Sequence, residues 1–150
     1  MVSPFDPKTV LLAKHAQHVV LIHFPIALFI AGVAFDFLGR WTKRPELADA
    51  AYYNFVGAAL TIVPVLATGV LAWQLQLEGQ RVKGILLMHM AAAGVSSAII
   101  GLVWWLHWRM RGRKNATTGF GLLALELVGV GAVAVTGHLG GFLSGVNGVS

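Results

Sequence analysis

The sequence predicts an all-α fold, an integral membrane bundle of four helices arranged up and down. Apolar residues make up 57% of the 150 residues and charged residues 11%, whereas soluble domains carry about 25% charged residues. Four apolar stretches each have roughly the 20 residues that an α-helix needs to cross the hydrocarbon layer. Short connections make neighbouring helices antiparallel.

These stretches cover residues 18–38, 55–77, 84–107 and 119–138, and together they predict one domain over residues 1–150. Pro64 lies in the middle of the second stretch, where neighbouring helices can satisfy the carbonyl that it leaves free. The 18 glycines favour close helix packing in lipid.

Three segments outside the stretches also carry structural signals. Residues 4–17 predict a short interfacial helix and lack the pattern of a cleaved signal peptide. Pro45, followed by acidic residues, predicts a short turn or helix at the interface. Residues 137–148 are rich in glycine and predict an extended tail packed on the outer face.

The basic residues predict the orientation in the membrane. Most of them flank the first and third connections: Arg40, Lys43, Arg44, Arg109, Arg111, Arg113 and Lys114. Such an excess marks the cytoplasmic side, so both termini and the second connection are expected outside. The formal net charge of +5 therefore reflects topology, and no nucleic-acid partner is expected.

The chain has no cysteine. This excludes disulfides, thiolate nucleophiles, zinc held by cysteine, iron–sulfur clusters on this chain and covalently attached c-type haem. A cofactor held by histidine remains compatible with the composition. There is also no Gly-rich phosphate loop and no metalloprotease motif.

The predicted topology sorts the six histidines. His18 opens the first helix, His23 lies five residues inside it, His89 lies five residues inside the third, and His138 closes the fourth. At about 1.5 Å per residue, His23 matches the depth of His89, and His18 matches that of His138. All four lie toward the outer side, whereas His15 and His107 are expected to be interfacial residues.

Imidazoles from two facing helices are the axial ligands of a b-type haem. We therefore expect one or two haem b groups, with His23 paired with His89 and His18 paired with His138. Two alternatives remain. The histidines form hydrogen bonds between the helices of a cofactor-free membrane anchor or assembly subunit, or His23, His89 and His138 converge on a zinc or copper ion.

Other polar residues inside the stretches have simpler expected partners. Asp36 precedes Arg40 by four residues, a spacing that predicts an ion pair on one helix. Glu126 is expected either to relay protons toward a quinone or to bond to Thr61, Ser96 or Ser97. Arg81 and Lys83, at the second connection, are candidates to meet haem propionates.

The first helix resembles a bacterial membrane family classed as a domain of unknown function, DUF family 2231. The resemblance is carried by His18, by "HFPIAL" at residues 23–28 and by "FD" at residues 35–36. Thr68-Gly69, Trp73, His89 and "GHLGGFL" with His138 extend it over nearly the whole chain. Val19, Ala72, Phe142 and Asn147 depart from the family's common residues, and the four helical histidines remain.

The resemblance implies a bacterial inner-membrane location, and domains of this family are sometimes joined to c-type cytochrome or Rieske modules. The sequence therefore favours an electron-transfer subunit over a stand-alone enzyme. Its expected partners are membrane lipid, other subunits of a redox complex, an outer-side cytochrome or iron–sulfur protein, and a quinone.

Overall fold

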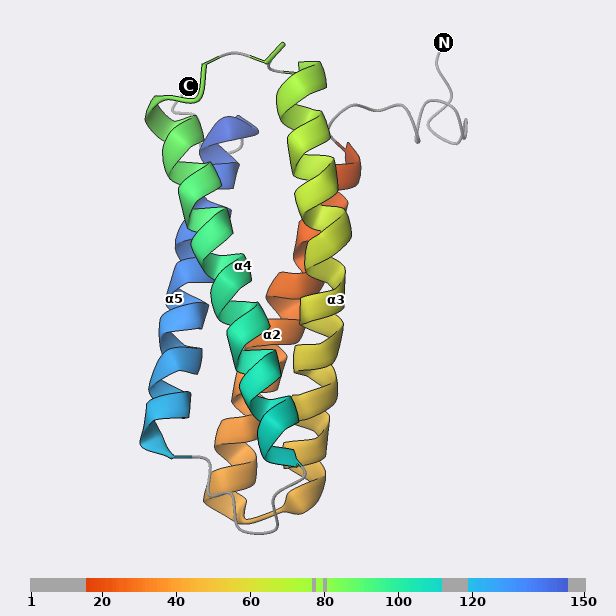
Figure 1. The fold of residues 1–150 in the computed structure, drawn as a ribbon, viewed down its shortest axis with the longest axis vertical. Helices are drawn as coiled ribbons and strands as arrows, with labels where there is room; N and C mark the ends of the chain where they lie inside the picture. The colour runs from red at the N-terminus through yellow and green to blue at the C-terminus, as the bar shows by residue number, and fades with distance from the viewer. Residues whose placement is uncertain (1–15, 77, 80, 112–118, 146–150) are drawn as a thin grey trace.

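The computed structural model describes residues 16–76, 78–79, 81–111 and 119–145. Within these residues the chain forms four helices and no strand (Figure 1). Helix α2 spans Ala16–Thr42, α3 spans Pro45–Gln76, α4 spans Gly84–Arg111 and α5 spans Phe120–Leu143. Each is long and apolar enough to cross a membrane. The predicted all-α bundle of four spanning helices is confirmed.

The helices extend beyond the apolar stretches at several ends. Helix α3 begins at Pro45, so the residues after this proline form its first turns and not a separate interfacial element. Helix α5 continues to Leu143, so the extended tail predicted from Gly137 is wrong up to that residue. Glycine is common in membrane helices. Most of the predicted interfacial helix over residues 4–17 lies outside the described residues.

A tight connection joins α2 to α3. The N–H of Arg44 donates to the carbonyl of Gly39 at 3.2 Å, and Lys43 takes a left-handed conformation with φ of 55°, the pattern of a Schellman cap. Pro45 occupies the first position of α3, where no N–H is needed. A Cβ on Gly39 would lie 3.2 Å from the nitrogen of Ala48, so glycine permits this close turn.

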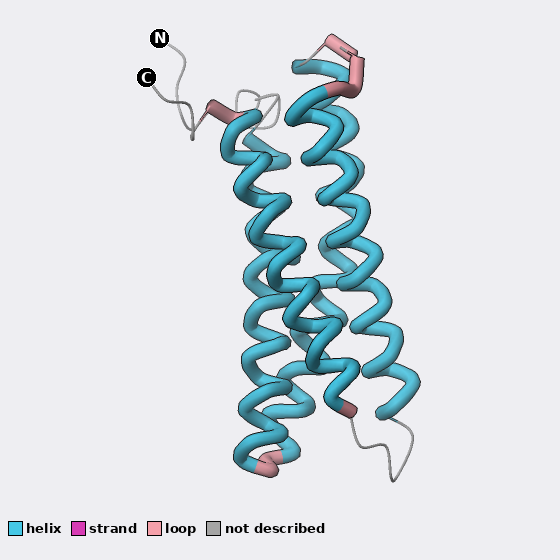
Figure 2. The backbone as a smooth tube through the Cα atoms, turned by 90° about the vertical axis from the view of Figure 1, so that its left-hand side faces the viewer, coloured by secondary structure: helices cyan, strands magenta, loops and turns pink. Residues whose placement is uncertain are grey.

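The four helices form two hairpins, because α2 packs mainly on α3 and α4 mainly on α5. Figure 2 shows the α2–α3 connection at one end of the bundle and the α3–α4 connection at the other. The order is therefore up-down-up-down, as short connections predict.

The two hairpins contact each other most closely at the end that carries the α2–α3 connection. Phe29 of α2 fills a notch at Gly129 of α5, where a Cβ would lie 2.7 Å from the ring. The rings of Phe55 on α3 and His107 on α4 are 4.6 Å apart. The buried core cluster lies at the same end: Phe29, Val33, Ala51, Phe55, Ala58, Ile100, Val103 and Val133.

We call this end the closed half; it comprises α2 from Phe29 onward, α3 up to Ala58, α4 from Ile99 onward and α5 up to Val133. The rest of the described helices is the open half. Figure 1 shows α3 and α4 diverging toward the open half. His18, His23, His89 and His138 all belong to the open half.

Candidate functional site

His18 lies in the seam between α2 and α3. Its Nδ1 is 3.2 Å from the hydroxyl of Thr68. That hydroxyl already donates to the carbonyl of Pro64 at 2.8 Å, so it accepts from the imidazole. A Cβ on the neighbouring Gly69 would lie 3.0 Å from the His18 ring. The Thr68-Gly69 pair thus provides both an acceptor and the space for this imidazole.

His89 has a corresponding place in the seam between α4 and α5. Its Nδ1 donates to the carbonyl of Thr136 at 3.1 Å. The Thr136 hydroxyl lies 2.8 Å from that of Ser96, which is about two turns further along the same face of α4. A Cβ on Gly140 would lie 3.2 Å from the His89 ring. Each hairpin therefore holds one half-buried imidazole against a threonine and a glycine of its second helix.

These hydrogen bonds indicate the tautomer of each neutral ring. In both histidines Nδ1 is the donor, so in the neutral ring Nε2 carries the lone pair. Histidines that ligate metals commonly donate their other ring N–H to a carbonyl or a similar acceptor, which fixes the ring and raises its basicity. His18 and His89 both show this arrangement.

The two rings also lie at similar depths. Gly69, beside His18, precedes the end of α3 at Gln76 by seven residues, and His89 follows the start of α4 at Gly84 by five. At 1.5 Å per residue these positions are about 10 Å and about 7.5 Å from the same end of the bundle. The structure thus presents His18 and His89 from separate hairpins at nearly one level.

The other two predicted ligands are exposed. His23 is five residues from His18, about 140° around the helix, and its Nδ1 donates to the Val19 carbonyl of its own helix at 2.6 Å. His138 is exposed and packs edge-on against Phe142. The structure therefore separates the predicted set into two half-buried rings in the seams and two exposed rings.

Arg81 and Lys83, the predicted partners of haem propionates, are exposed residues of the α3–α4 connection. His15 lies outside the described residues. Among the described residues, the group of three or more histidine and acidic side chains gathered closely enough to hold a metal is Asp36, His107 and Glu126. His23, His89 and His138 do not form such a group.

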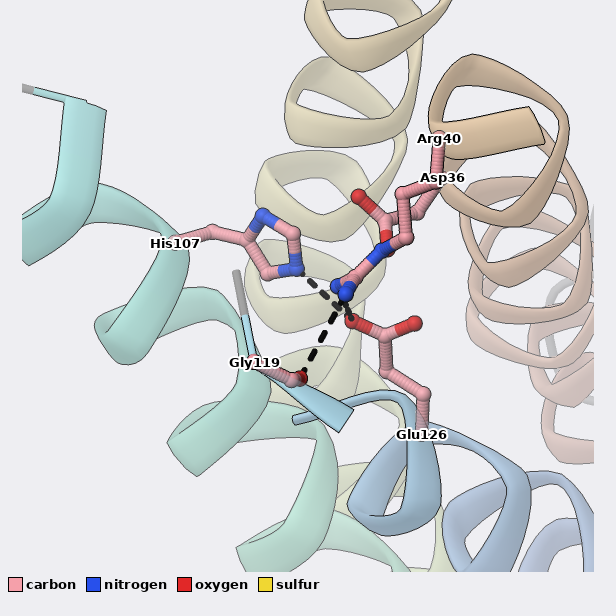
Figure 3. A network of polar contacts seen from close by, with 5 residues as sticks. All are labelled: Asp36, Arg40, His107, Gly119 and Glu126. Carbon is pink, nitrogen blue, oxygen red and sulfur yellow. Dashed lines mark hydrogen bonds and ion pairs between the residues drawn. The ribbon is translucent and has the colours of Figure 1, made fainter. Parts of the chain in front are cut away.

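A second set of polar residues is buried in the closed half (Figure 3). The Nε2 of His107 lies 2.8 Å from Oε1 of Glu126. The guanidinium of Arg40 donates to Asp36 at 2.5 Å and approaches the same Glu126 oxygen at 3.9 Å. The set joins α2, α4 and α5, and thus connects the two hairpins.

This cluster confirms one prediction and overturns two. The Asp36–Arg40 pair forms as the spacing of four residues predicts. His107 is buried at 8% exposure, so its prediction as an interfacial residue is wrong. Glu126 bonds to His107 and not to Thr61, Ser96 or Ser97, and the hydroxyls of Thr61 and Ser96 donate to carbonyls of their own helices.

Sequence signals for the His107–Glu126 pair were present. His107 precedes the end of α4 by four residues and Glu126 follows the start of α5 by six, which places them about 6 Å and about 9 Å deep. The depth argument applied to the four outer histidines therefore also matches these two. Leu86, Ser96, Ile100, Val103 and His107 form one buried stripe on α4, and that stripe faces inward.

Comparison with known proteins assigns the chain at the level of family. A sequence model of the family described as "Predicted membrane protein (DUF2231)" matches residues 14–150. No curated protein matches, and no solved structure matches. The match and the four spanning helices agree that the molecule is a membrane protein.

Proposed function

We propose that this chain, which belongs to the DUF2231 family of membrane proteins, binds haem b in its open half and transfers electrons. The observation that carries the proposal is the matched arrangement of His18 and His89. Each donates Nδ1–H to the second helix of its hairpin. In the neutral ring each then carries its lone pair on Nε2, at nearly the same depth and on a different hairpin.

The donor set suits haem iron. Two neutral imidazoles give a six-coordinate b-type centre, and no cysteine is required. Gly69 and Gly140 leave the rings the space that a Cβ would fill. These features support His18 with His89 as the first ligand pair.

Haem supplies a one-electron couple when it is bound. The residues of the chain position it: Thr68 and the Thr136 carbonyl hold the two imidazoles in one tautomer. His23 and His138 are the remaining candidates for a second haem. Electrons would pass between an outer-side cytochrome or iron–sulfur protein and the quinone pool or a neighbouring subunit.

Optical spectra of the purified protein, made with ample haem and recorded oxidised and reduced, test the proposal. We expect a Soret band that is lost in His18→Leu and in His89→Leu, because a low-spin bis-imidazole iron needs both nitrogens. His23→Leu and His138→Leu count the haems. These variants keep the full absorbance if the protein binds one haem, and they lose part of it if the protein binds two. Wild-type protein without a Soret band would refute haem binding.

A cofactor-free anchor or assembly subunit is the second candidate, and the same hydrogen bonds favour it. His18 and Thr68 join α2 to α3, and His89 and Thr136 join α4 to α5. Interhelical bonds of this kind stabilise membrane helix pairs by about 0.6–2 kcal/mol. In this case His89→Leu weakens the hairpin and no spectrum changes, so the spectra and the unfolding free energy distinguish the two functions.

The location that the proposal requires is the bacterial inner membrane, with both termini outside. The motive is the group of basic residues around the first and third connections. The chain has no cysteine, so a single introduced one reports its own position. A cysteine at Ser150 should react with an impermeant thiol reagent in intact cells, and one at Lys43 only after lysis. The reverse pattern would invert the topology.

A further inference from the structure

The buried cluster of the closed half has an unbalanced charge. Glu126 is 0% exposed, Asp36 4% and His107 8%. With both carboxylates ionised, Arg40 charged and His107 neutral, these four residues carry one net negative charge. An uncompensated charge inside a membrane bundle is costly. The cluster therefore favours the uptake of one more positive charge.

The geometry provides a place for a proton. His107 and Glu126 share a hydrogen bond of 2.8 Å through Nε2 and Oε1. The other oxygen of Glu126, Oε2, is buried, and no described residue gives it a hydrogen bond. In Figure 3 this oxygen points away from both His107 and Arg40. A buried carboxylate oxygen without a donor is destabilised, and protonation of the carboxyl removes that cost.

A proton balances the cluster better than a metal ion does. The atoms of Asp36, His107 and Glu126 that could bind a metal lie within 4.8 Å of one another. However, the Arg40 guanidinium already lies 2.5 Å from Asp36 and 3.9 Å from Glu126. A divalent cation would leave one net positive charge and would face this guanidinium. One proton brings the net charge to zero and displaces nothing.

Water can reach the cluster from the nearer end of the bundle. A cavity of about 350 Å³ at the α2–α3 connection is lined by the buried Asp36 and His107. The exposed Lys43, Arg44 and Asp49 line it too. The buried or half-buried charged and titratable groups of the cluster are Asp36 and Arg40 on α2, His107 on α4 and Glu126 on α5. At the rim of the cavity Arg111 pairs with Asp49 and Arg44 with Glu46, and water screens the exposed charges of these pairs and of Lys43.

We propose that Asp36, Arg40, His107 and Glu126 form a proton-binding site that takes up one exchangeable proton through this cavity. The proton bonds to the carboxylate of Glu126, which shares a hydrogen bond with His107, and no electron moves. The site lies in the closed half, apart from the proposed haem ligands, and it does not depend on haem.

Infrared difference spectra of the full chain in lipid nanodiscs, titrated over about pH 5–8 without haem, test the proposal. Wild-type protein should gain one protonated-carboxyl carbonyl band on acidification, and the band should shift in D2O. Glu126→Gln keeps the size and loses the band. Asp49→Asn makes the same type of change, acid to amide, at an exposed residue on the cavity rim, and this variant should keep the band.

Asp36→Asn separates charge balance from simple burial. It leaves Arg40 and Glu126 as a neutral pair, so the band should disappear from the titrated range although Glu126 is present. A band unchanged in Glu126→Gln, or in Asp36→Asn, would overturn the proposal. So would a wild-type protein with no such band that binds one Zn²⁺ per chain and loses this binding in Glu126→Gln.

Discussion

Both halves of the molecule hold a histidine of α4 against α5, but the two histidines have different partners. In the closed half His107 bonds to the carboxylate of Glu126, with Arg40 beside it. In the open half His89 bonds to the neutral carbonyl of Thr136. The first belongs to a network that joins the hairpins, whereas the second stays within its hairpin.

The difference shows how a small membrane bundle divides its polar residues. Charged groups are placed where the hairpins pack most closely, because there residues from three helices can contact one another. The imidazoles of His18 and His89 are placed where the helices diverge, and their hydrogen bonds to Thr68 and Thr136 stay within one hairpin. The closed half therefore joins the two hairpins through polar contacts, and the proposed haem would join them in the open half.

The largest expected effect is in the closed half. Arg40→Leu removes the cation beside two buried carboxylates, and breaking a buried pair costs about 3–5 kcal/mol. Arg44→Leu is the matched control, since Arg44 and its partner Glu46 are 65% and 70% exposed. It should change the unfolding free energy by less than about 0.5 kcal/mol. Equilibrium unfolding in mixed micelles measures the unfolding free energy of both variants. Equal losses of free energy would contradict the placement of the important charged contacts in the closed half.

Packing between the hairpins gives the next largest effect. Gly129→Ala adds a Cβ 2.7 Å from Phe29 and 2.9 Å from Ile99. Overpacking of this kind typically costs about 1–3 kcal/mol. Gly131→Ala, two residues away on the same helix, meets no atom within 4 Å. Thermal unfolding followed by circular dichroism should show a lower midpoint temperature for Gly129→Ala and an unchanged one for Gly131→Ala. A shared decrease would show that the closed half is not close-packed there.

An intermediate effect is expected at the acceptor of His18. Thr68→Val keeps the shape and removes the hydroxyl that accepts from Nδ1. Loss of such a support typically weakens binding of the coordinated group by 10–100-fold. A haem titration followed at the Soret band should show the weakening, and Thr61→Val serves as control because Thr61 bonds to carbonyls of its own helix. Equal haem affinity in both variants would remove Thr68 from the site.

The helices could be predicted from the sequence because lipid imposes a length and a composition that each segment must meet. The Asp36–Arg40 pair could be predicted for a related reason, since both residues lie one turn apart on one helix. Both inferences need only one element at a time. The same holds for the depth of each histidine, which follows from its distance to a helix end.

Rotation and pairing of helices could not be predicted in this way. His23 and His89 match in depth, yet His23 is exposed and bonds to its own helix. His107 looks like an end residue in the sequence, and its burial depends on Phe55 and Glu126 from two other helices. Depth sets the level of a side chain, whereas the face that it presents depends on which neighbours pack best.

The smallest expected effect comes from a glycine-to-alanine substitution in the open half, the same type of change that is expected to disrupt the closed half at Gly129. Gly140→Ala removes a helical glycine, which by itself favours the helix by up to about 1 kcal/mol. It also places a Cβ 3.2 Å from Cε1 of His89, so the ring must move by a few tenths of an ångström. We expect these contributions to cancel to within about 0.5 kcal/mol of unfolding free energy. Gly137→Ala, which meets no atom within 4 Å, should instead be slightly more stable than wild type.

The two variants also separate packing from ligand binding. Because Gly140→Ala displaces His89 and Gly137→Ala does not, haem affinity should fall in the first and stay unchanged in the second. A destabilisation of Gly140→Ala as large as that of Gly129→Ala would mean that the α4–α5 seam is as rigid in the open half as in the closed half. In that case the open half could not adjust around a ligand, and the anchor function would be the better account of His89.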